Sequence, residues 1–411
     1  MMKSVKMHKI RPGNPPSNWC PKGFDTVQVS IFCLFLLIFI LSPVSYSFCA
    51  EIFVPDDYPT ITDALEMAEA GDTIIVKPGI YRERIKMKAG VNLVSYAGTD
   101  GDELVEGPGK RKVLKRALRT IIDGSDLSEP GYLISFPTET TEPMMVDGFT
   151  FQNMPEYVSS INLFMMEIRA CSPRVVNNIF KGNKTWGGIL ATGLGIGMGP
   201  PLETKAEPYI AHNVICYNNG PGIANGSNSA AKILDNEIFG NRFKDSAKRR
   251  HFAPGIGLRE KARPLIEGNL CYNNGVGIGI LNLDSSPEAL TIRNNEIHHN
   301  DIAGISIRGV GGPGIESSVL IEFNRIFNNL EVGVRSTKTT SVTLRYNEIF
   351  GNKKSGISLW DVNRAIIEDN EIYSNYTTGI RLLAVPMARV RRNHIYGNVT
   401  AGVDIVSWEK E

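Results

Sequence analysis

The chain has 411 residues and a formal net charge of +1 at pH 7. A charge this close to zero gives no broad positive surface for nucleic acid, so we predict no nucleic-acid partner. Basic residues do gather at 110–119 and 244–250, between repeated elements, and we expect both clusters to form solvated loops.

Residues 31–41 form an uninterrupted apolar run that follows a segment rich in Lys and Arg. The run is shorter than the roughly 20 apolar residues that span a bilayer as a helix. These features predict a secretory signal, with residues 1–50 as signal peptide and leader. We therefore expect a secreted, periplasmic or cell-envelope protein, whose only membrane contact would be through an uncleaved signal segment.

Two elements are predicted after this leader. Residues 58–68 have apolar side chains at 61, 64, 65 and 68, a spacing that indicates a short, capped amphipathic helix. Residues 71–81 follow as turn, strand and turn. We interpret residues 51–100 as an N-terminal cap and first coil, which would cover one end of the core.

One pattern recurs from Asn178 to Val403: Asn, any residue, an aliphatic residue, two residues, Asn, three residues, Gly, then Ile or Val. Its first position falls at Asn178, Asn213, Asn236, Gly268 in place of Asn, Asn295, Asn324, Asn347, Asn370 and Asn393. The last three intervals are 23 residues each. A period of this size predicts stacked coils, here over about residues 145–405.

Each copy has three apolar positions: one before the first Asn, one after it and one after the Gly. Apolar and polar residues alternate around them, and Ile, Val, Asn and Gly outnumber helix formers, so each position lies on a predicted strand. In the copy at Gly268 we assign Leu265 and Leu270 to the first two columns. Three inward columns predict an all-β coil of three parallel strands around a common interior.

Two outward columns support this register. Successive copies carry charges of alternating sign at Arg293, Glu322, Arg345, Glu368 and Arg391. A second column holds rings at Phe327, Phe350, Tyr373 and Tyr396, with His298 at its head. We expect opposite charges on adjacent strands to pair, and neighbouring rings to stack.

The Asn and Gly columns have structural explanations. Asn tolerates the left-handed turn conformation, and stacked Asn amides can hydrogen-bond from coil to coil. We prefer this role to N-glycosylation at the sequons of Asn183 and Asn398. The Gly is expected either to relieve crowding or to permit a positive φ at a corner.

With these motifs, the chain resembles the right-handed parallel β-helix of the pectin-lyase-like superfamily over about residues 51–405. The helix and strand at 58–81 are similar to the cap that closes the N-terminal end in that superfamily. The resemblance implies a single domain, 51–411. It also implies that any activity lies in a groove on one sheet, walled by loops.

Cys171, Cys216 and Cys271 lie downstream of the leader. We place Cys216 and Cys271 in one column two coils apart, which would separate them by about 9.6 Å. A disulfide needs Cα atoms within roughly 7 Å of each other. The sequence therefore predicts free, largely buried thiols.

Irregular coil lengths mark candidate walls for a groove. Extra residues occur at about 192–206, 241–254, 282–288 and 308–317. Long loops on a regular scaffold commonly carry function, so we expect a cleft in the first two-thirds of the coils.

Alternate residues of the strand after the Gly are predicted to point outward. The candidate substrate-binding residues there are Arg259, Arg308, Arg335, Trp360, Asp361, Arg381 and Asp404. Guanidinium groups pair with carboxylates and a flat apolar ring can cover a sugar face, so this set suits an acidic polysaccharide. The alternative is a solvated face in which Arg381 and Asp404 simply pair.

No catalytic residue can be assigned from the motifs. A calcium-dependent lyase of the superfamily should show clustered Asp ligands and an Arg base near a Pro, and residues 259–264 are only a loose match. The paired Asp residues of polygalacturonase-like hydrolases, and the motifs of pectin methylesterases and uronan epimerases, have no counterpart in the coils. Calcium therefore lacks a supporting ligand set, and no metal site or cofactor is predicted.

An accessory protein class implicated in copper insertion into nitrous oxide reductase shares this fold and export. That similarity rests on the repeats alone, since His298 and His394 lie four coils apart, too far to share an ion. We interpret the chain as an exported β-helix that binds an acidic polysaccharide or processes it as a lyase or hydrolase. The alternative is a non-catalytic envelope accessory protein or a structural scaffold. The oligomeric state stays open.

Overall fold

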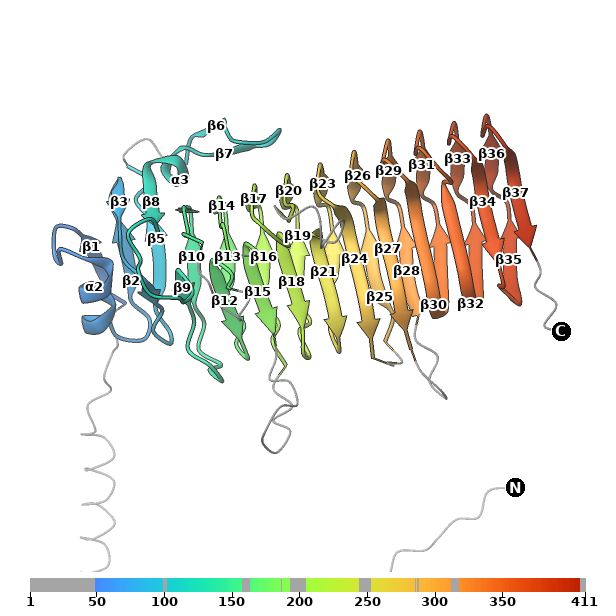
Figure 1. Ribbon diagram of the computed structural model, residues 1–411. Helices are drawn as coiled ribbons and strands as arrows, with labels where there is room; N and C mark the ends of the chain where they lie inside the picture. The colour runs from blue at the N-terminus through green and yellow to red at the C-terminus, as the bar shows by residue number, and fades with distance from the viewer. Residues whose placement is uncertain are drawn as a thin grey trace, which may run out of the picture. The chain divides into compact units, whose positions relative to one another are not determined.

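The computed structural model describes residues 49–98, 102–156, 163–185, 187–192, 205–243, 253–284, 286, 288–311 and 318–406. The predicted signal segment and the basic cluster at 244–250 lie outside these ranges. The described chain winds rung upon rung into a right-handed parallel β-helix with three strands per turn (Figure 1). In the described ranges, no helix has the length and apolar character needed to cross a membrane.

The strands form three faces, A, B and C, with one strand of each face per rung. Face A contains β4 (Ile85–Lys86), β9 (Ile134–Ser135), β12 (Met166–Arg169), β15 (Ile189–Thr192), β18 (Ile223–Gly226), β21 (Pro254–Glu260), β24 (Val276–Leu283), β27 (Ala303–Val310), the first parts of β30 (Val332–Arg345) and β32 (Ile357–Glu368), β34 (Thr378–Leu383) and β37 (Ala401–Val406). Face B contains β1 (Glu51–Val54), β2 (Thr73–Val76), β5 (Asn92–Ser95), β10 (Met145–Asp147), β13 (Arg174–Val176), β16 (Tyr209–Ala211), β19 (Lys232–Leu234), β22 (Leu265–Glu267), β25 (Leu290–Arg293), β28 (Ser318–Glu322), the last parts of β30 and β32, and β35 (Met387–Arg391). Face C contains β3 (Gly79–Tyr81), β8 (Thr120–Asp123), β11 (Thr150–Gln152), β14 (Ile179–Lys181), β17 (Val214–Cys216), β20 (Glu237–Phe239), β23 (Leu270–Tyr272), β26 (Glu296–His298), β29 (Arg325–Phe327), β31 (Glu348–Phe350), β33 (Glu371–Tyr373) and β36 (His394–Tyr396).

A short helix, α2 (Ile61–Met67), follows the first strand and confirms the predicted amphipathic segment. The hydroxyl of Thr60 caps the helix by accepting a hydrogen bond from the backbone N–H of Asp63 at 3.0 Å. Ile61, Ala64 and Leu65 are buried against the first rungs. The helix therefore places its apolar side on the core.

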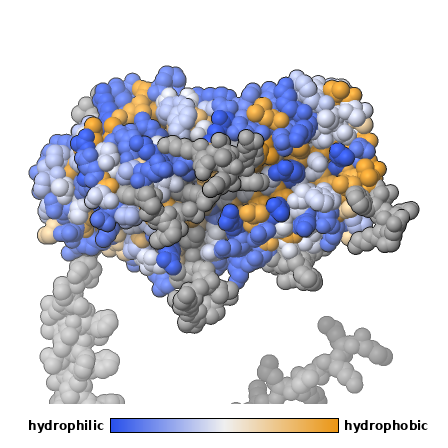
Figure 2. Space-filling model, in the orientation of Figure 1, coloured by the Kyte–Doolittle hydropathy of each residue, from blue (hydrophilic) through white to orange (hydrophobic). Residues whose placement is uncertain are grey.

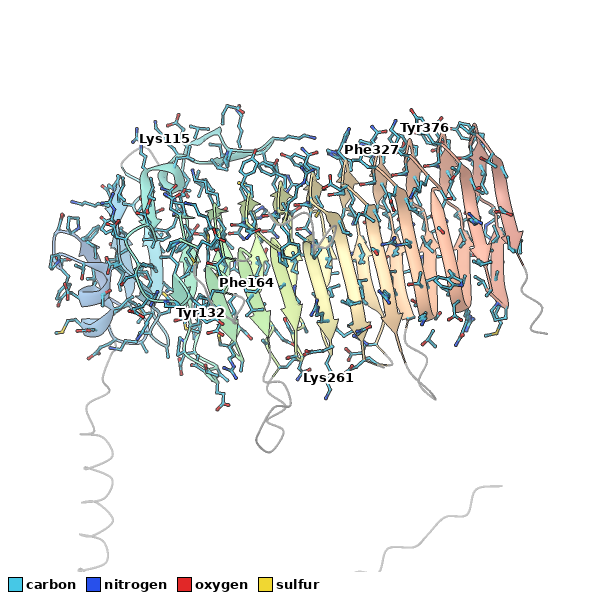
Figure 3. All side chains as sticks on the ribbon, viewed as in Figure 1. Lys115, Tyr132, Phe164, Lys261, Phe327 and Tyr376 are labelled. Atoms are coloured by element: carbon cyan, nitrogen blue, oxygen red, sulfur yellow. The ribbon has the colours of Figure 1, made fainter. Side chains whose placement is uncertain are left out.

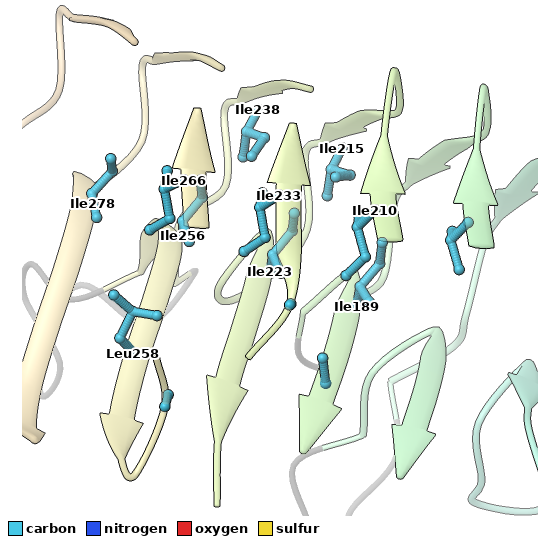
Figure 4. Close-up of a cluster of buried hydrophobic side chains, with 14 of the residues drawn as sticks. Ile189, Ile210, Ile215, Ile223, Ile233, Ile238, Ile256, Leu258, Ile266 and Ile278 are labelled. Atoms are coloured by element: carbon cyan, nitrogen blue, oxygen red, sulfur yellow. The ribbon is translucent and has the colours of Figure 1, made fainter. Parts of the chain in front are cut away.

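The interior consists of the predicted apolar columns, whose side chains converge from all three faces (Figure 4). One assignment is wrong: Ile266 and Cys271, and not Leu265 and Leu270, continue the inward columns. The reason is that Gly268, with a φ of 69°, fills the corner position before the ladder Asn, which is residue 269. Because side chains alternate along a strand, this shift of one residue exchanges inside and outside.

Two columns of buried Asn side chains run along the corners that precede and follow face C. Asn324 is representative: its Oδ1 accepts from the backbone N and the Nδ2 of Asn295, both at 3.0 Å. Its own Nδ2 donates to the carbonyl oxygen of Ile292 at 2.9 Å and to Oδ1 of Asn347 at 3.0 Å. The predicted coil-to-coil hydrogen bonding is thus confirmed, and every polar atom of the buried amide has a partner.

The left-handed conformation belongs to the residue before each ladder Asn, so that part of the prediction is wrong. Asn177 and Asn294, with φ of 57° and 55°, precede the ladder residues 178 and 295. The corner glycines are explained by crowding. A Cβ on Gly333 would lie 2.6 Å from the carbonyl oxygen of Gly356 on the next rung, closer than real Cβ contacts come. Asn183 is 1% exposed, so its sequon offers no accessible amide.

The two outward columns are confirmed. Arg345 is paired in register with Glu322 on one neighbouring strand and with Glu368 on the other, and its Nε lies 2.8 Å from Oε2 of Glu322. On face C the rings of Phe327 and Phe350 stack with centroids 4.9 Å apart and planes 2° apart. The rings continue to Tyr396 in one direction and, in the other, beyond His298 to Tyr272 and Phe239. His298 therefore does not head the column, because the outward position on the two preceding rungs is also a ring.

A hairpin that the sequence did not reveal lies over face C. It consists of β6 (Leu104–Glu106) and β7 (Lys112–Leu114), followed by α3 (Lys115–Arg119), and in Figure 1 it reaches towards β20. Val113 and Leu114 join a buried cluster with Phe239, Leu270 and other outward residues of face C. The backbone N–H groups of residues 110 and 111 donate to the two carboxyl oxygens of the fully buried Glu237, at 2.6 and 2.9 Å. The expectation of a solvated loop at 110–119 is therefore wrong, because apolar and hydrogen-bonding groups fix this segment to the sheet.

Cys171, Cys216 and Cys271 are free and buried, as predicted. Cys216 and Cys271 do not share a column: Cys216 points outward beneath the hairpin, whereas Cys271 faces the interior. Burial raises the pKa of both thiols to about 12. Both are therefore protonated at neutral pH and protected from thiol chemistry while the structure stays closed.

Candidate functional site

Face A carries the predicted outward residues in two parallel columns that cross successive rungs. Column 1 contains Ser306, Arg335, Ser358, Arg381 and Asp404. Column 2 contains Arg259, Leu281, Arg308, Thr337, Trp360 and Leu383. The structure thus brings six of the seven candidate residues onto one surface, although the sequence spreads them from residue 259 to residue 404.

The arginines form two pairs along the solenoid axis, one pair on each column. Arg259 and Arg308 lie two rungs apart on column 2, and Arg335 and Arg381 lie two rungs apart on column 1. At roughly 4.8 Å per rung, each pair is separated by about 10 Å. Nη2 of Arg335 donates to Oγ of Ser306 at 3.1 Å, which holds the guanidinium against the sheet.

Trp360 stands between these cations with half of its surface exposed. It lies in register with Thr337 and Leu383, while Arg335 and Arg381 occupy column 1 on the rungs to either side. The arrangement combines a flat apolar ring with a guanidinium on each flank.

Two of the predicted residues differ from the rest. Asp361 has a φ of 54° and turns the chain from face A towards face B, so it lies at the edge of the surface, next to Trp360. Asp404 pairs with Arg381, whose Nε lies 3.5 Å from Oδ2. Arg381 and Asp404 thus form the ion pair that the alternative interpretation predicted, and both side chains remain substantially exposed.

Extra residues flank face A on both edges. The segment at 241–254 enters at the beginning of β21, and those at 192–206, 282–288 and 308–317 leave from the ends of β15, β24 and β27. Residues 193–204, 244–252, 285, 287 and 312–317 of these segments lie outside the described ranges. The described ends of these segments therefore lie at the two edges of face A.

On the rungs of β21 and β24, column 1 of face A has no projecting side chain. Gly257 and Gly279 occupy column 1, and the ring of Pro254 lies over both. A Cβ on Gly257 would lie 2.9 Å from Cγ of Pro254. Backbone and one proline ring thus form column 1 on these two rungs; Arg259 lies beside them in column 2, and the other arginines and Trp360 lie on later rungs.

A further polar group on face A had no signal in the sequence. Tyr132 hydrogen-bonds Glu167 of β12, and burial, with the nearby Glu167 carboxyl, raises the pKa of Tyr132. Arg169 of the same strand is exposed beside them. These residues precede the first regular repeat at Asn178, so no periodicity marked them.

The histidines have structural contacts. His298 stacks on Phe327 at 4.8 Å, as predicted, and its Nε2 lies 3.0 Å from Nζ of Lys110. An ammonium group only donates, so Nε2 accepts and His298 is neutral, with its proton on Nδ1, facing Nδ1 of His299 at 2.7 Å. Burial, followed by the positive charge of Lys110, lowers the pKa of His298 to about 4. Within the part of the chain that the structure covers, no group of three or more His, Cys, Asp or Glu side chains is arranged to hold a metal ion.

Fold and surface together define a parallel β-helix with a cationic, aromatic strip along one face. The family model described as "Right handed beta helix region" matches residues 168–318 and 288–411, and the chain belongs to this family. No curated protein matches the sequence.

Solved structures with the same fold include two modules from Azotobacter vinelandii. The mannuronan C-5 epimerase AlgE4 A-module has a TM-score of 0.57 and 14% identity, covering 84% of this chain and 91% of that one. The AlgE6 A-module has a TM-score of 0.54 and 14% identity, with 84% and 93% covered. The Dettilon tailspike protein has a TM-score of 0.55 and 14% identity, with 87% of this chain and 68% of that chain covered. At this level of identity the likeness shows the fold.

Proposed function

We propose that this protein binds or processes an acidic polysaccharide on face A. The observation that carries the proposal is the strip formed by Arg259, Arg308, Arg335 and Arg381 around the half-exposed Trp360. Guanidinium groups pair with sugar carboxylates in a fork geometry, and an indole ring covers the apolar face of a pyranose.

The strip favours a linear glycan that lies along the solenoid axis. Within each column its two arginines lie two rungs apart, about 10 Å, and Arg308 of column 2 lies on the rung next to Arg335 of column 1. An extended polyuronate lying along this axis would present carboxylates to the arginines of both columns. The names of the mannuronan epimerases, with which this chain shares its fold, add support because mannuronan is a polyuronate.

A binding panel of uronate polymers and neutral glycans of the same length tests the proposal. Wild type is expected to prefer the uronates, and Trp360→Ala and Arg335→Ala are each expected to lower affinity by about tenfold. Arg391→Ala, on face B, is the matched control for removing an arginine elsewhere on the solenoid. Unchanged affinity in both face A variants would refute the assignment of this face.

The same panel separates binding from processing. A lyase product is unsaturated and absorbs in the ultraviolet, whereas a hydrolase product has new reducing ends without that absorbance. A tightly bound polymer with neither change would exclude both lyase and hydrolase chemistry.

We further propose that the protein is exported to the cell envelope or beyond. The proposal rests on the apolar run at 31–41 and the basic segment before it. Cell fractionation with N-terminal sequencing tests it: a mature chain that begins near residue 50 supports export with cleavage, and an intact cytosolic chain would exclude export.

A further inference from the structure

The corner between faces B and C contains one left-handed residue per rung. These residues are Asn177, His212, Asp235, Gly268, Asn294, Phe323, Tyr346, Asp369 and Arg392, with φ between 52° and 69°. Asn, Asp and Gly tolerate this conformation, whereas bulky aromatic residues rarely adopt it. Phe323 and Tyr346 are the two members of the column with large, mainly apolar rings.

These two rings are also exposed. Phe323 is 51% and Tyr346 48% exposed, and they stack on each other with centroids 5.0 Å apart and planes 11° apart. On either side the column has a shorter side chain, Asn294 before the pair and Asp369 after it. The stack therefore consists of these two rings, and about half of each remains exposed.

Stability of the fold gives no reason for these residues. An Asn at the same corner, as at Asn177 and Asn294, satisfies the backbone without strain and without placing an apolar ring in water. In return, these two strained residues stack on each other and Tyr346 lies under the guanidinium of Arg345, while about half of each ring stays exposed. Backbone strain of this kind concentrates at functional sites, so the left-handed backbone of Phe323 and Tyr346 suggests that their exposed rings bind a ligand.

The size and surroundings of the pair indicate the ligand. Half of two aromatic side chains presents on the order of 200 Å², whereas each partner in a stable protein interface buries roughly 800 Å². The rim is polar: Asn294 and Asp369 flank the rings, and the guanidinium of Arg345 lies 5.9 Å from the ring of Tyr346. A small apolar platform bordered by amide, carboxylate and guanidinium groups matches one pyranose unit, with its apolar face and hydroxyl edges.

We propose that Phe323 and Tyr346 form a second saccharide-binding site, separate from face A, in which a sugar ring packs on the aromatic pair while the flanking polar groups bind its hydroxyls. The choice of glycan to test rests on the function proposed above. The site itself rests on the strain, exposure and surroundings of the two rings.

The experiment uses calorimetric titration of the full protein with mannuronate hexasaccharide and, separately, with xylohexaose. The test variant is Phe323→Asn/Tyr346→Asn, and Tyr346→Phe, which keeps the ring, is the matched control. The double variant should raise the midpoint of thermal unfolding, because Asn fits the left-handed corner, while about tenfold or more of the affinity at one of two sites is lost. Tyr346→Phe should keep both sites.

The outcomes separate this site from face A. If the Asn variant keeps two sites, or unfolds at a lower temperature than wild type, the rings are not a binding platform and the inference is overturned. Loss of one site in this variant, with Trp360→Ala/Arg335→Ala unchanged, would support the inference and overturn the face A proposal. If wild type binds neither oligosaccharide, both the second site and the face A proposal are overturned.

Discussion

Glu237 fixes the hairpin of residues 104–114 to face C, and its replacement by Gln should loosen the hairpin while the rungs stay folded. The fully buried carboxyl accepts three hydrogen bonds: from the backbone N–H groups of residues 110 and 111, and from the hydroxyl of Tyr272 at 2.7 Å. Gln keeps the size but turns one acceptor oxygen into a donor, which leaves a hairpin N–H without its acceptor.

The cost follows from that lost contact. A buried donor left unsatisfied costs about 1–3 kcal/mol, so we expect about 2 kcal/mol for opening the hairpin. Since 1.4 kcal/mol corresponds to a factor of ten, the open population should rise about 30-fold.

Cys216 provides the assay because it is buried in the cluster beneath the hairpin, whereas Cys271 faces the solenoid interior. With a pKa raised to about 12 by burial, the Cys216 thiol should react with an alkylating reagent only when the hairpin opens. Labelling resolved by peptide mass spectrometry should accelerate about 30-fold at Cys216 and stay unchanged at Cys271.

Glu348→Gln is the matched control, since Glu348 accepts from the Tyr373 hydroxyl on the same face but contacts no hairpin residue among those described. If Cys216 and Cys271 accelerate together, the hairpin and the rungs open as one unit. If neither changes, Glu237 does not hold the hairpin. Either result would refute the reasoning.

Three further predictions concern the solenoid itself. Asn324→Ala removes a buried amide with both neighbours in its ladder and should lower the free energy of unfolding by about 3 kcal/mol in urea titration. Asn393→Ala, at the last described rung of the same ladder, should cost less, and equal losses would contradict a role for the ladder. The pKa of His298 is about 4 in the folded chain and near 6.5 when unfolded, so below pH 6.5 the unfolded chain takes up a proton that the folded chain does not. The free energy of unfolding should therefore fall by about 3 kcal/mol as the pH drops from 6.5 to 4. His298→Phe should remove this part of the acid sensitivity while keeping the ring stack; an unaltered pH profile would count against it. Gly356→Ala should lower the free energy of unfolding in urea titration by about 1–3 kcal/mol, because the new Cβ would lie 2.8 Å from the carbonyl oxygen of Gly379. An unchanged free energy of unfolding would mean that the rungs can move apart to make room for the Cβ.

The fold was predictable from the sequence because a solenoid places like positions of successive repeats next to each other. The alternating signs at Arg293, Glu322 and Arg345 therefore became pairs of adjacent residues, and Trp360 and Arg335 fell on the same outward strip. The repeat pattern gives the wrong register only at Gly268, where it assigns the ladder position to the left-handed corner residue. A glycine resembles an ordinary gap in the pattern, and only the hydrogen bonds of the ladder reveal which residue replaces it.

Features without periodicity were decided by tertiary structure. Nothing in the sequence around residue 110 connects it with Glu237, which lies 127 residues away and receives its backbone N–H. Likewise, Phe323 and Tyr346 carry no sign of their left-handed backbone or exposure until the corner is built around them. The sequence by itself determined which side chains stack from rung to rung, since that depends on spacing within the repeat. Which insertion covers which face, and which corner residue is strained, depends on contacts between segments that share no spacing, so only the folded chain determines them.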